Sequence, residues 1–285
     1  MIVCADDYGL RDDIDEAILE LCLRGKLTAV SCMVAFERCT SDTLTRLRQH
    51  EAHVDLGLHL CLTNEGLTRS LVPPTPGLIA DPPSYPRLLK TAFTGRVPPR
   101  RIRDEVAMQY ELFLTKCGRA PNHIDGHLHV HQLPGVRDGL LDFVLSLPPE
   151  RRPYIRNTAL PLPNLWRNRL PWLKAALVAA FGSRMKVKLR AAGVATNQGF
   201  AGVYDFRQYN RYPGYLPRFV NCLVEPTGIL VVHPGKNENW RQQEYAALDN
   251  FAFPAGSPNR FGDAWRETPT RHGAAGLETK AMPFP

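Results

Sequence analysis

The sequence predicts an α/β protein built around a parallel sheet, either open or closed into a barrel. Short apolar runs alternate with helical patterns through most of the 285 residues, which is the order expected of repeated β–α units. A hydrophobic content of 44% and a charged content of 22% are ordinary for a globular chain with ample length for a core. We find no internal repeat and no convincing linker, so residues 1–285 are expected to form a single domain.

The first two β–α units have clear sequence signals. Residues 1–5, "MIVCA", predict a strand, and residues 12–26 carry an apolar stripe at helical spacing with acidic residues at its start. Residues 27–35, "LTAVSCMVA", predict a second strand. The helix expected over residues 41–50 opens with Ser41, a residue type that caps helix N-termini.

The third strand is predicted by strict alternation over residues 54–62, "VDLGLHLCL". Its leucines share one face, and His59 lies on the other. Residues 64–100 are rich in proline and predict a long loop or excursion. A helix is expected over about 101–116.

The second half of the chain continues the pattern with weaker signals. Its expected strands, helices and irregular tail are, in chain order, a strand at 154–158, helices within 168–192 and 214–224, a strand at 228–235, a helix at 241–250 and an irregular tail from about 255.

Charge, apolar runs and cysteines limit the class of partner and the compartment. The net charge of +7 is modest, and the arginines are not interleaved with aromatic residues, so a nucleic-acid platform is not expected. No apolar run approaches the roughly 20 residues of a membrane span. The N-terminus lacks the pattern of a secretory signal, and the seven cysteines form no CxxC pair. We therefore expect a cytoplasmic protein, with a homodimer as the default assembly.

Residues suited to catalysis collect where the predicted strands end. In parallel α/β folds, ligands bind at the carboxyl ends of the strands. Four such ends carry acidic or imidazole side chains, and the residues are Asp6 and Asp7, His59, His127 and His233.

Asp6 and Asp7 directly follow an apolar strand. Consecutive side chains diverge, so one carboxylate could bind a cation while the other reaches a water beside it. The plainer alternative is a helix cap or an Asx turn before Gly9.

The stretch "HIDGHLHVH" at 123–131 places four histidines and an aspartate at positions of one parity. In an extended chain His123, His127, His129 and His131 could all point the same way. At about 3.3 Å per residue the stretch would span more than about 25 Å, so at most two neighbouring side chains could bind one ion. A surface histidine patch is the alternative.

His59 and His233 also have two interpretations each. A lone histidine on the polar face of a strand is commonly a hydrogen-bonded interior residue. His233 ends the apolar run "GILVV" and could be a capping residue. Because imidazole titrates near neutral pH, His233 could instead act as a general acid.

Four motifs resemble, in order and spacing, the YdjC-like carbohydrate deacetylases. They are "CADDYGL", "GLHLCLT", "PNHIDGHLHVHQLP" and "VVHPG", and an "RxxE" from Arg241 to Glu244 is similar to the family's C-terminal part. The resemblance covers about residues 1–250. It implies a (β/α) barrel, regular or distorted, related to polysaccharide deacetylases. It also implies the removal of acetyl groups from N-acetylated amino sugars or oligosaccharides, with one divalent metal ion, magnesium or zinc.

The resemblance also assigns roles to residues of this chain. It implies that Asp7, His59 and His127 bind the metal, that Asp6 is the catalytic base and that His233 is the acid.

His129, His131 and Arg156 are expected to support or line the site. Arg156 could bind a substrate hydroxyl or orient Asp6, and a surface arginine is the alternative. Carboxylate and imidazole ligands together also suit cobalt or manganese.

Departures from the family pattern leave the metal triad intact. Asp15 stands where asparagine is common and Leu128 where a polar residue is frequent, so they concern substrate preference. Two rival functions remain open from the sequence. One is a metal-dependent phosphoesterase or amidohydrolase-type barrel, although these place an HxH near the first strand. The other is a non-catalytic carbohydrate-binding homologue, which would have no need of a water-activating base.

Overall fold

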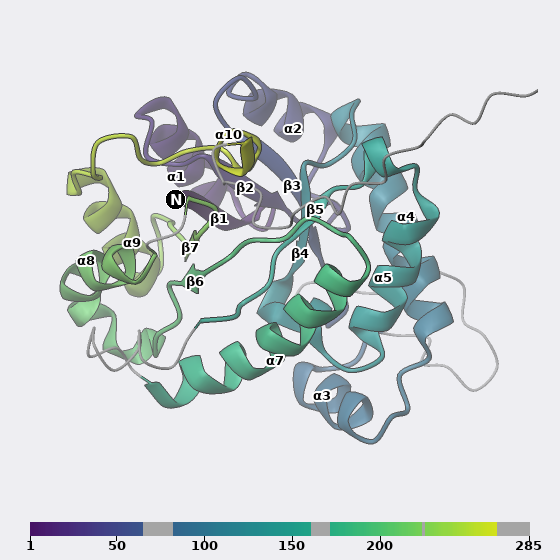
Figure 1. Ribbon diagram of the computed structural model, residues 1–285. Coiled ribbons are helices and arrows are strands. Elements are labelled where there is room, and N and C mark those ends of the chain that lie inside the picture. Colours follow the sequence, from purple (N-terminus) through teal and green to yellow (C-terminus); the bar gives the residue numbers. More distant parts are fainter. Residues whose placement is uncertain (65–81, 161–171, 224–225, 267–285) are drawn as a thin grey trace, which may run out of the picture.

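The computed structural model describes residues 1–64, 82–160, 172–223 and 226–266 (Figure 1). Its centre is a curled, seven-stranded parallel sheet in the order β5-β4-β3-β2-β1-β7-β6, with helices around its outer surface (Figure 1). The predicted α/β class and parallel sheet are confirmed. Within the described residues the sheet does not close on itself between β5 and β6, so the fold is a half-barrel and not a complete barrel. The strands are β1 (Ile2–Tyr8), β2 (Ala29–Cys32), β3 (Asp55–Leu60), β4 (His123–Gly126), β5 (Tyr154–Ile155), β6 (Phe200–Ala201) and β7 (Ile229–Val232).

The helices follow the predicted order, with some different ends. Among the described residues, no helix has the length and apolar character needed to cross a membrane. The α-helices are α1 (Asp12–Leu23), α2 (Ser41–Arg48), α3 (Tyr85–Phe93), α4 (Pro99–Cys117), α5 (Val136–Ser146), α7 (Trp172–Ala191), α8 (Tyr212–Cys222), α9 (Asn239–Asn250) and α10 (Phe261–Arg266), and the short 3₁₀ helices are η1 (His127–Gln132), η2 (Pro149–Arg151) and η3 (Phe206–Arg211).

Three predicted details are wrong at these helices. The cap of α2 is Thr40, whose side chain accepts a hydrogen bond from the Thr43 backbone N–H, so Ser41 is already the first helical residue. The proline-rich excursion contains α3 and the start of α4, because proline is compatible with the first turn of a helix. Part of the excursion, residues 65–81, lies outside the described residues. The tail from about 255 includes α10, and residues 267–285 are again outside them.

The histidine-rich stretch is extended for only four residues. After Gly126 the chain turns, because Leu128 and His129 take left-handed backbone angles with φ of 52° and 58°. The expectation of one shared face therefore fails beyond β4. The sequence gives no local sign of this turn, since both residues carry a Cβ that disfavours the conformation.

The two faces of the sheet contact different sets of buried side chains. On its outer face, apolar side chains such as Leu56, Leu58 and Leu60 of β3 pack against the helices, as the alternation predicted. Inside the curl, a smaller apolar cluster occupies the end where the strands begin. There the ring of Phe261 from α10 stacks on Tyr154, with centroids 3.8 Å apart.

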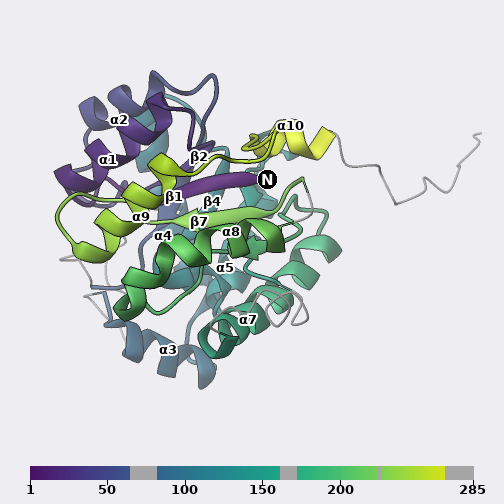
Figure 2. The same cartoon turned by 90° about the vertical axis from the view of Figure 1, so that its left-hand side faces the viewer.

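The C-terminal segment closes this amino-terminal end of the half-barrel. Figure 2 places α10 beside the start of β1, where the Asn259 N–H donates to the carbonyl of Met1. Arg260 and the Phe261 N–H both bind the Asp55 carboxylate, at 2.9 and 3.0 Å. Because the amino-terminal end is covered, a ligand would reach the interior of the sheet from the carboxyl end of the strands.

Asparagine side chains join the segment before β6 to β5. A single bridge pairs Ile155 with Thr196, and the amides of Asn157 and Asn197 each donate to the backbone carbonyl of the other, at 2.7 and 2.9 Å. This clasp fixes the residue that follows β5, Arg156, inside the curl.

Candidate active site

A bulge in β1 brings both aspartates of the DD pair near His59. The register with β2 shifts between Ala5 and Tyr8, and Asp7 has a φ of 72°. Bulges commonly redirect side chains beside active sites. Here Asp6 Oδ2 and Asp7 Oδ1 lie 3.9 and 3.5 Å from the same atom, His59 Nε2. Asp7 groups with His127 and Asp6 with Asp125, so the two carboxylates have different neighbours around His59.

Asp7, His59 and His127 form a cluster with the composition of a metal site. Asp7 Oδ1 lies 3.1 Å from His127 Nδ1, and one donor atom from each residue falls within 4.8 Å of the others. Asp7 and His59 are buried, whereas 18% of the His127 side chain is exposed. One carboxylate with two imidazoles fits a divalent cation such as zinc, cobalt or manganese, and a cation here would be reachable from one side.

Asp125 sets the orientation of His59. The register of β3 and β4 places the two residues opposite each other, and His59 Nδ1 donates to Asp125 Oδ1 at 2.6 Å. The other nitrogen, Nε2, is then the one that faces the cluster and could bind a cation. A carboxylate behind a ligand histidine is a common arrangement at metal sites. Asp125 has no predicted role, although its parity with the histidines is visible in the sequence.

The surrounding charges favour a positive charge on His59 and a negative charge on Asp7. Burial alone lowers the pKa of His59, but the nearby carboxylates of Asp6 and Asp125 raise it to about 10. Burial alone raises the pKa of Asp7, but hydrogen bonds from His127 and His59 together with the Arg241 guanidinium hold it well below its usual range. A proton thus occupies His59 at neutral pH, and a metal ion would replace it.

Arg156 holds Asp6 through two parallel hydrogen bonds. Nη1 and Nη2 donate to Oδ1 and Oδ2 at 2.7 and 2.8 Å, and Nη1 also lies 2.9 Å from Asp125 Oδ2. The Arg156 side chain is completely buried, so the predicted contact with a substrate hydroxyl does not fit. The other predicted role, orienting Asp6, does fit.

The two later histidines of the segment differ from each other. His131 is fully buried, and its Nε2 donates to the Arg156 carbonyl at 2.9 Å, so it supports the site and cannot contact a substrate. His129 is half-buried and meets the ring of Phe200 edge-on. Burial, followed by the charge of Arg156, holds the pKa of His129 well below its usual range. His129 can still line the site as a neutral imidazole.

His233 faces Asp6 from the end of β7. Its Nε2 lies 3.9 Å from Asp6 Oδ2, and its backbone N–H donates to Glu244 Oε2 at 2.6 Å. Burial lowers the pKa of His233 to about 4, although Asp7 and Asp6 oppose this. Burial also raises the pKa of Glu244 to about 7, and the Tyr204 hydroxyl donates to that carboxylate.

The RxxE motif is thereby explained in part: Glu244 holds the backbone of His233. Arg241, the other half of the motif, donates to Asp7 Oδ2 at 2.6 Å. Both residues belong to the predicted RxxE motif, but neither has a predicted role. Their spacing of three on a helix, which puts both on one face, was the available signal.

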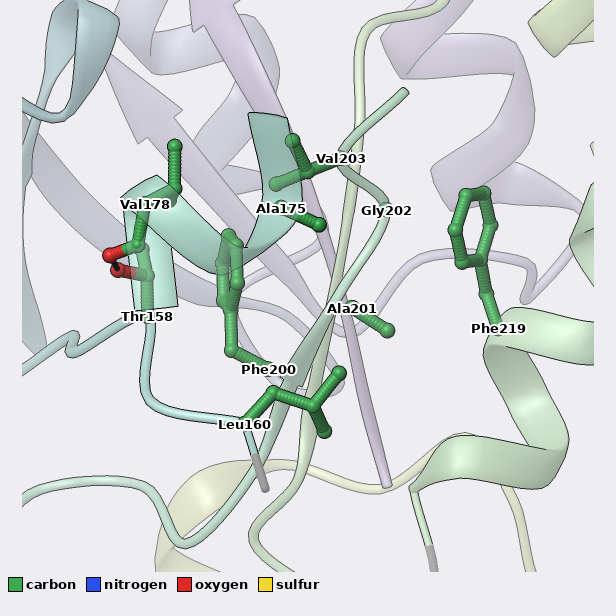
Figure 3. A pocket seen from close by; sticks show the side chains of 9 residues that line it. All are labelled: Thr158, Leu160, Ala175, Val178, Phe200, Ala201, Gly202, Val203 and Phe219. Atoms are coloured by element: carbon green, nitrogen blue, oxygen red, sulfur yellow. Dashed lines mark hydrogen bonds between the residues drawn. The ribbon is translucent and has the colours of Figure 1, made fainter. Parts of the chain in front are cut away.

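An apolar pocket includes Phe200 in its lining (Figure 3). It is bounded by the residues that follow β5 and β6 and by side chains of α7 and α8. The Phe200 ring belongs to its lining, and the same ring contacts His129 and lies 5.9 Å from the guanidinium carbon of Arg156. The site therefore has an apolar neighbour beside its charged centre.

Known proteins resemble this chain in sequence and in fold. A chitooligosaccharide deacetylase from Escherichia fergusonii is 33% identical over 137 residues, which cover 48% of this chain and 52% of that protein. The match thus spans about half the length of the curated relative. A crystal structure from Enterococcus faecalis V583, described as that of a cellobiose-phosphate cleavage protein, aligns with a TM-score of 0.61 at 19% identity and covers 93% of both chains. This likeness shows the shared fold.

A family model gives the broadest match. The model described as "YdjC-like protein" matches residues 1–255, which contain every site residue discussed above. The chain is a member of the YdjC-like family.

Proposed function

We propose that this protein is a metal-dependent hydrolase that removes acetyl groups from N-acetylated amino sugars or their oligomers. The observation that carries the proposal is the convergence of Asp7, His59 and His127, with the Asp6 carboxylate beside them. A pure binding protein has no need of that second carboxylate. Family membership and the deacetylase relative support the same chemistry.

Asp7, His59 and His127 would hold one divalent cation. Two imidazoles favour zinc or a similar transition metal over magnesium, which prefers oxygen ligands. When bound, such a cation supplies a Lewis acid that polarises the amide carbonyl and lowers the pKa of water.

Asp6 is the proposed general base. Its two hydrogen bonds to Arg156 fix the plane of the carboxylate, which would accept a proton from the attacking water. A buried ion pair such as Asp6–Arg156 adds little net free energy to folding, so its main effect here is to orient the Asp6 carboxylate.

His233 is the proposed acid, and its protonation must follow that of Asp6. With a pKa of about 4, its imidazole is neutral in the free protein at neutral pH. The proton that Asp6 takes can pass to His233 Nε2, 3.9 Å away, and from there to the departing sugar nitrogen. The net result is one water consumed, with acetate and a free amine released.

Cytoplasmic location is part of the proposal. All seven cysteines are free and buried, as suits a protein kept in a reducing compartment.

The test measures metal content and acetate release on N-acetylated amino-sugar oligomers. His127→Ala should remove both the bound metal and the activity. Asp6→Asn should keep the metal and lose about two to four orders of magnitude in rate, the usual weight of a general base. His53→Ala, which changes an exposed histidine before β3, is the matched control and should alter neither. A full metal complement in His127→Ala would refute the ligand assignment. Release of phosphate from a phosphorylated sugar, with no acetate released from the acetylated oligomers, would favour the phosphoesterase alternative.

A further inference from the structure

Asp7 divides its two carboxylate oxygens between two partners. Oδ1 faces the imidazoles, 3.1 Å from His127 Nδ1 and 3.5 Å from His59 Nε2. Oδ2 accepts a hydrogen bond from Arg241 Nη2 at 2.6 Å. A charge-assisted bond of this length is strong, and it occupies the oxygen that would otherwise be free to turn toward a cation.

Arg241 is itself held in place on every side. Its Nε donates to Glu238 Oε2 at 2.9 Å, and its Nη1 reaches the carbonyl of His233 at 3.4 Å. The guanidinium carbon lies 4.3 Å from the centre of the Trp240 ring, which stacks on Phe206 at 4.2 Å. Only 6% of the side chain is exposed, so the arginine cannot leave Asp7 without repacking its neighbours.

This arrangement works against simple metal affinity. A guanidinium beside a ligand carboxylate repels a divalent cation and withdraws charge from the ligand. Asp7 and Asp6 are each paired with an arginine, so the cluster is nearly charge-compensated before any metal binds. The Arg241–Asp7 pair lowers the affinity for a cation and is nevertheless held by several contacts. This indicates that its role is to set the orientation of the Asp7 carboxylate.

We propose that Arg241 is a positioning residue that restricts Asp7 to binding the cation through Oδ1 alone. This inference rests on the metal triad of the proposed function. Three single-atom donors, one each from Asp7, His59 and His127, leave more coordination positions for water and the substrate carbonyl than a carboxylate bound through both oxygens would leave. The cluster is thereby kept open for chemistry at the expense of affinity.

Cobalt(II) is the probe, because its visible absorption weakens as its coordination number rises. Titration of the metal-free full-length protein with Co²⁺ gives stoichiometry, affinity and spectrum together. In Arg241→Met, which removes the donors and keeps the length, Co²⁺ should bind no more weakly than in the parent, while the visible absorption per bound ion falls. Acetate release should drop by about 10- to 100-fold, the usual effect of losing a group that orients a metal ligand.

Two further variants keep the test decisive. Glu238→Ala leaves Arg241 in place but removes its Nε partner, and it should change the spectrum in the same direction by a smaller amount. Arg241→Lys retains a charge and one donor and should restore part of the parent spectrum. If Arg241→Met does not fold, Glu238→Ala carries the test.

The possible outcomes separate this inference from the function it rests on. A parent protein that binds no stoichiometric Co²⁺ refutes the metal triad. If the parent binds Co²⁺ and both Arg241→Met and Glu238→Ala give the same Co²⁺ spectrum as the parent, only the role of Arg241 is refuted. Weaker binding with an unchanged spectrum would identify Arg241 as a purely structural residue and would also overturn the proposal.

Discussion

The burial of the Asp15 carboxyl predicts that the free energy of unfolding falls as the pH rises toward neutrality. It lies in the first turn of α1, 2% exposed, and its Oδ1 accepts a hydrogen bond from the Gly9 N–H at 2.6 Å, just after the DD pair. Its Oδ2 makes no hydrogen bond among the described residues, and the nearest cation, Arg38 Nη2, is 3.7 Å away. Burial raises the pKa of Asp15 from 3.8 to about 7, with the Gly9 hydrogen bond opposing the rise.

The sign and size of the effect follow from linkage. Between pH 4 and 7 the folded protein keeps a proton that the unfolded chain has already lost, so the free energy of unfolding falls as the pH rises. At 1.36 kcal/mol per pKa unit, the full cost above pH 7 is about 4 kcal/mol. The helix N-terminus favours the charged carboxylate by about 0.3–1 kcal/mol, which reduces this figure.

Asp15→Asn should remove this cost, because an amide oxygen can still accept from Gly9 and carries no charge. We expect the variant to be about 2–4 kcal/mol more stable than the parent at pH 8. That advantage should shrink by about 2 kcal/mol at pH 5, where the folded parent keeps its proton. Urea unfolding of the metal-free protein at a series of pH values measures the difference.

Asp42→Asn is the matched control for Asp15→Asn. Asp42 also lies in the first turn of a helix, but it is exposed, so its substitution should give no stabilisation that grows with pH. An Asp15→Asn advantage of equal size at pH 5 and pH 8 would show that Asp15 is not titrating near neutrality and that the reasoning from burial is wrong.

Three substitutions test packing at other places. Gly57→Ala would set its Cβ 2.1 Å from Nε2 of His123, so we expect at least about 1–3 kcal/mol of destabilisation, and an unchanged urea midpoint would contradict the close approach. Arg156→Met leaves the buried Asp6 carboxylate without its partner and should cost about 3–5 kcal/mol by the same assay, whereas a cost under about 1 kcal/mol would mean that solvent reaches the pair. Phe261→Ala removes a buried ring and should cost about 3–5 kcal/mol while cobalt binding stays normal, and a loss of cobalt binding would show that α10 affects the metal site.

The fold and the positions of the site residues could be predicted because both depend on strong local patterns. Alternating β and α signals give a parallel sheet, and the carboxyl ends of its strands meet at one edge. Asp7 and His59 therefore had to lie near each other once β1 and β3 were recognised. The choice of His127 among the histidines came from a resemblance, because spacing alone allowed several.

The partners behind the site could not be predicted in the same way. Whether Arg156 faces inward depends on a strand of two residues and on the clasp between Asn157 and Asn197, which are 40 positions apart. The pairing of Asp7 with Arg241 joins residues separated by 234 positions. Contacts of this range are set by tertiary packing, which leaves no periodic trace in the sequence.

The backbone supplies separate support for the site. Among the described residues, the non-glycine residues with positive φ are Asp7, Leu128 and His129. Each such residue costs about 1–3 kcal/mol and persists only where its surroundings enforce it. Asp7 lies in β1, and the other two lie in η1 directly after His127. The strand before η1, β4, is not a neighbour of β1 in the sheet. Backbone strain in two separate segments, β1 and η1, thus occurs at one cluster of side chains. Such strain is expected where the direction of a side chain matters for chemistry, and packing alone does not explain it.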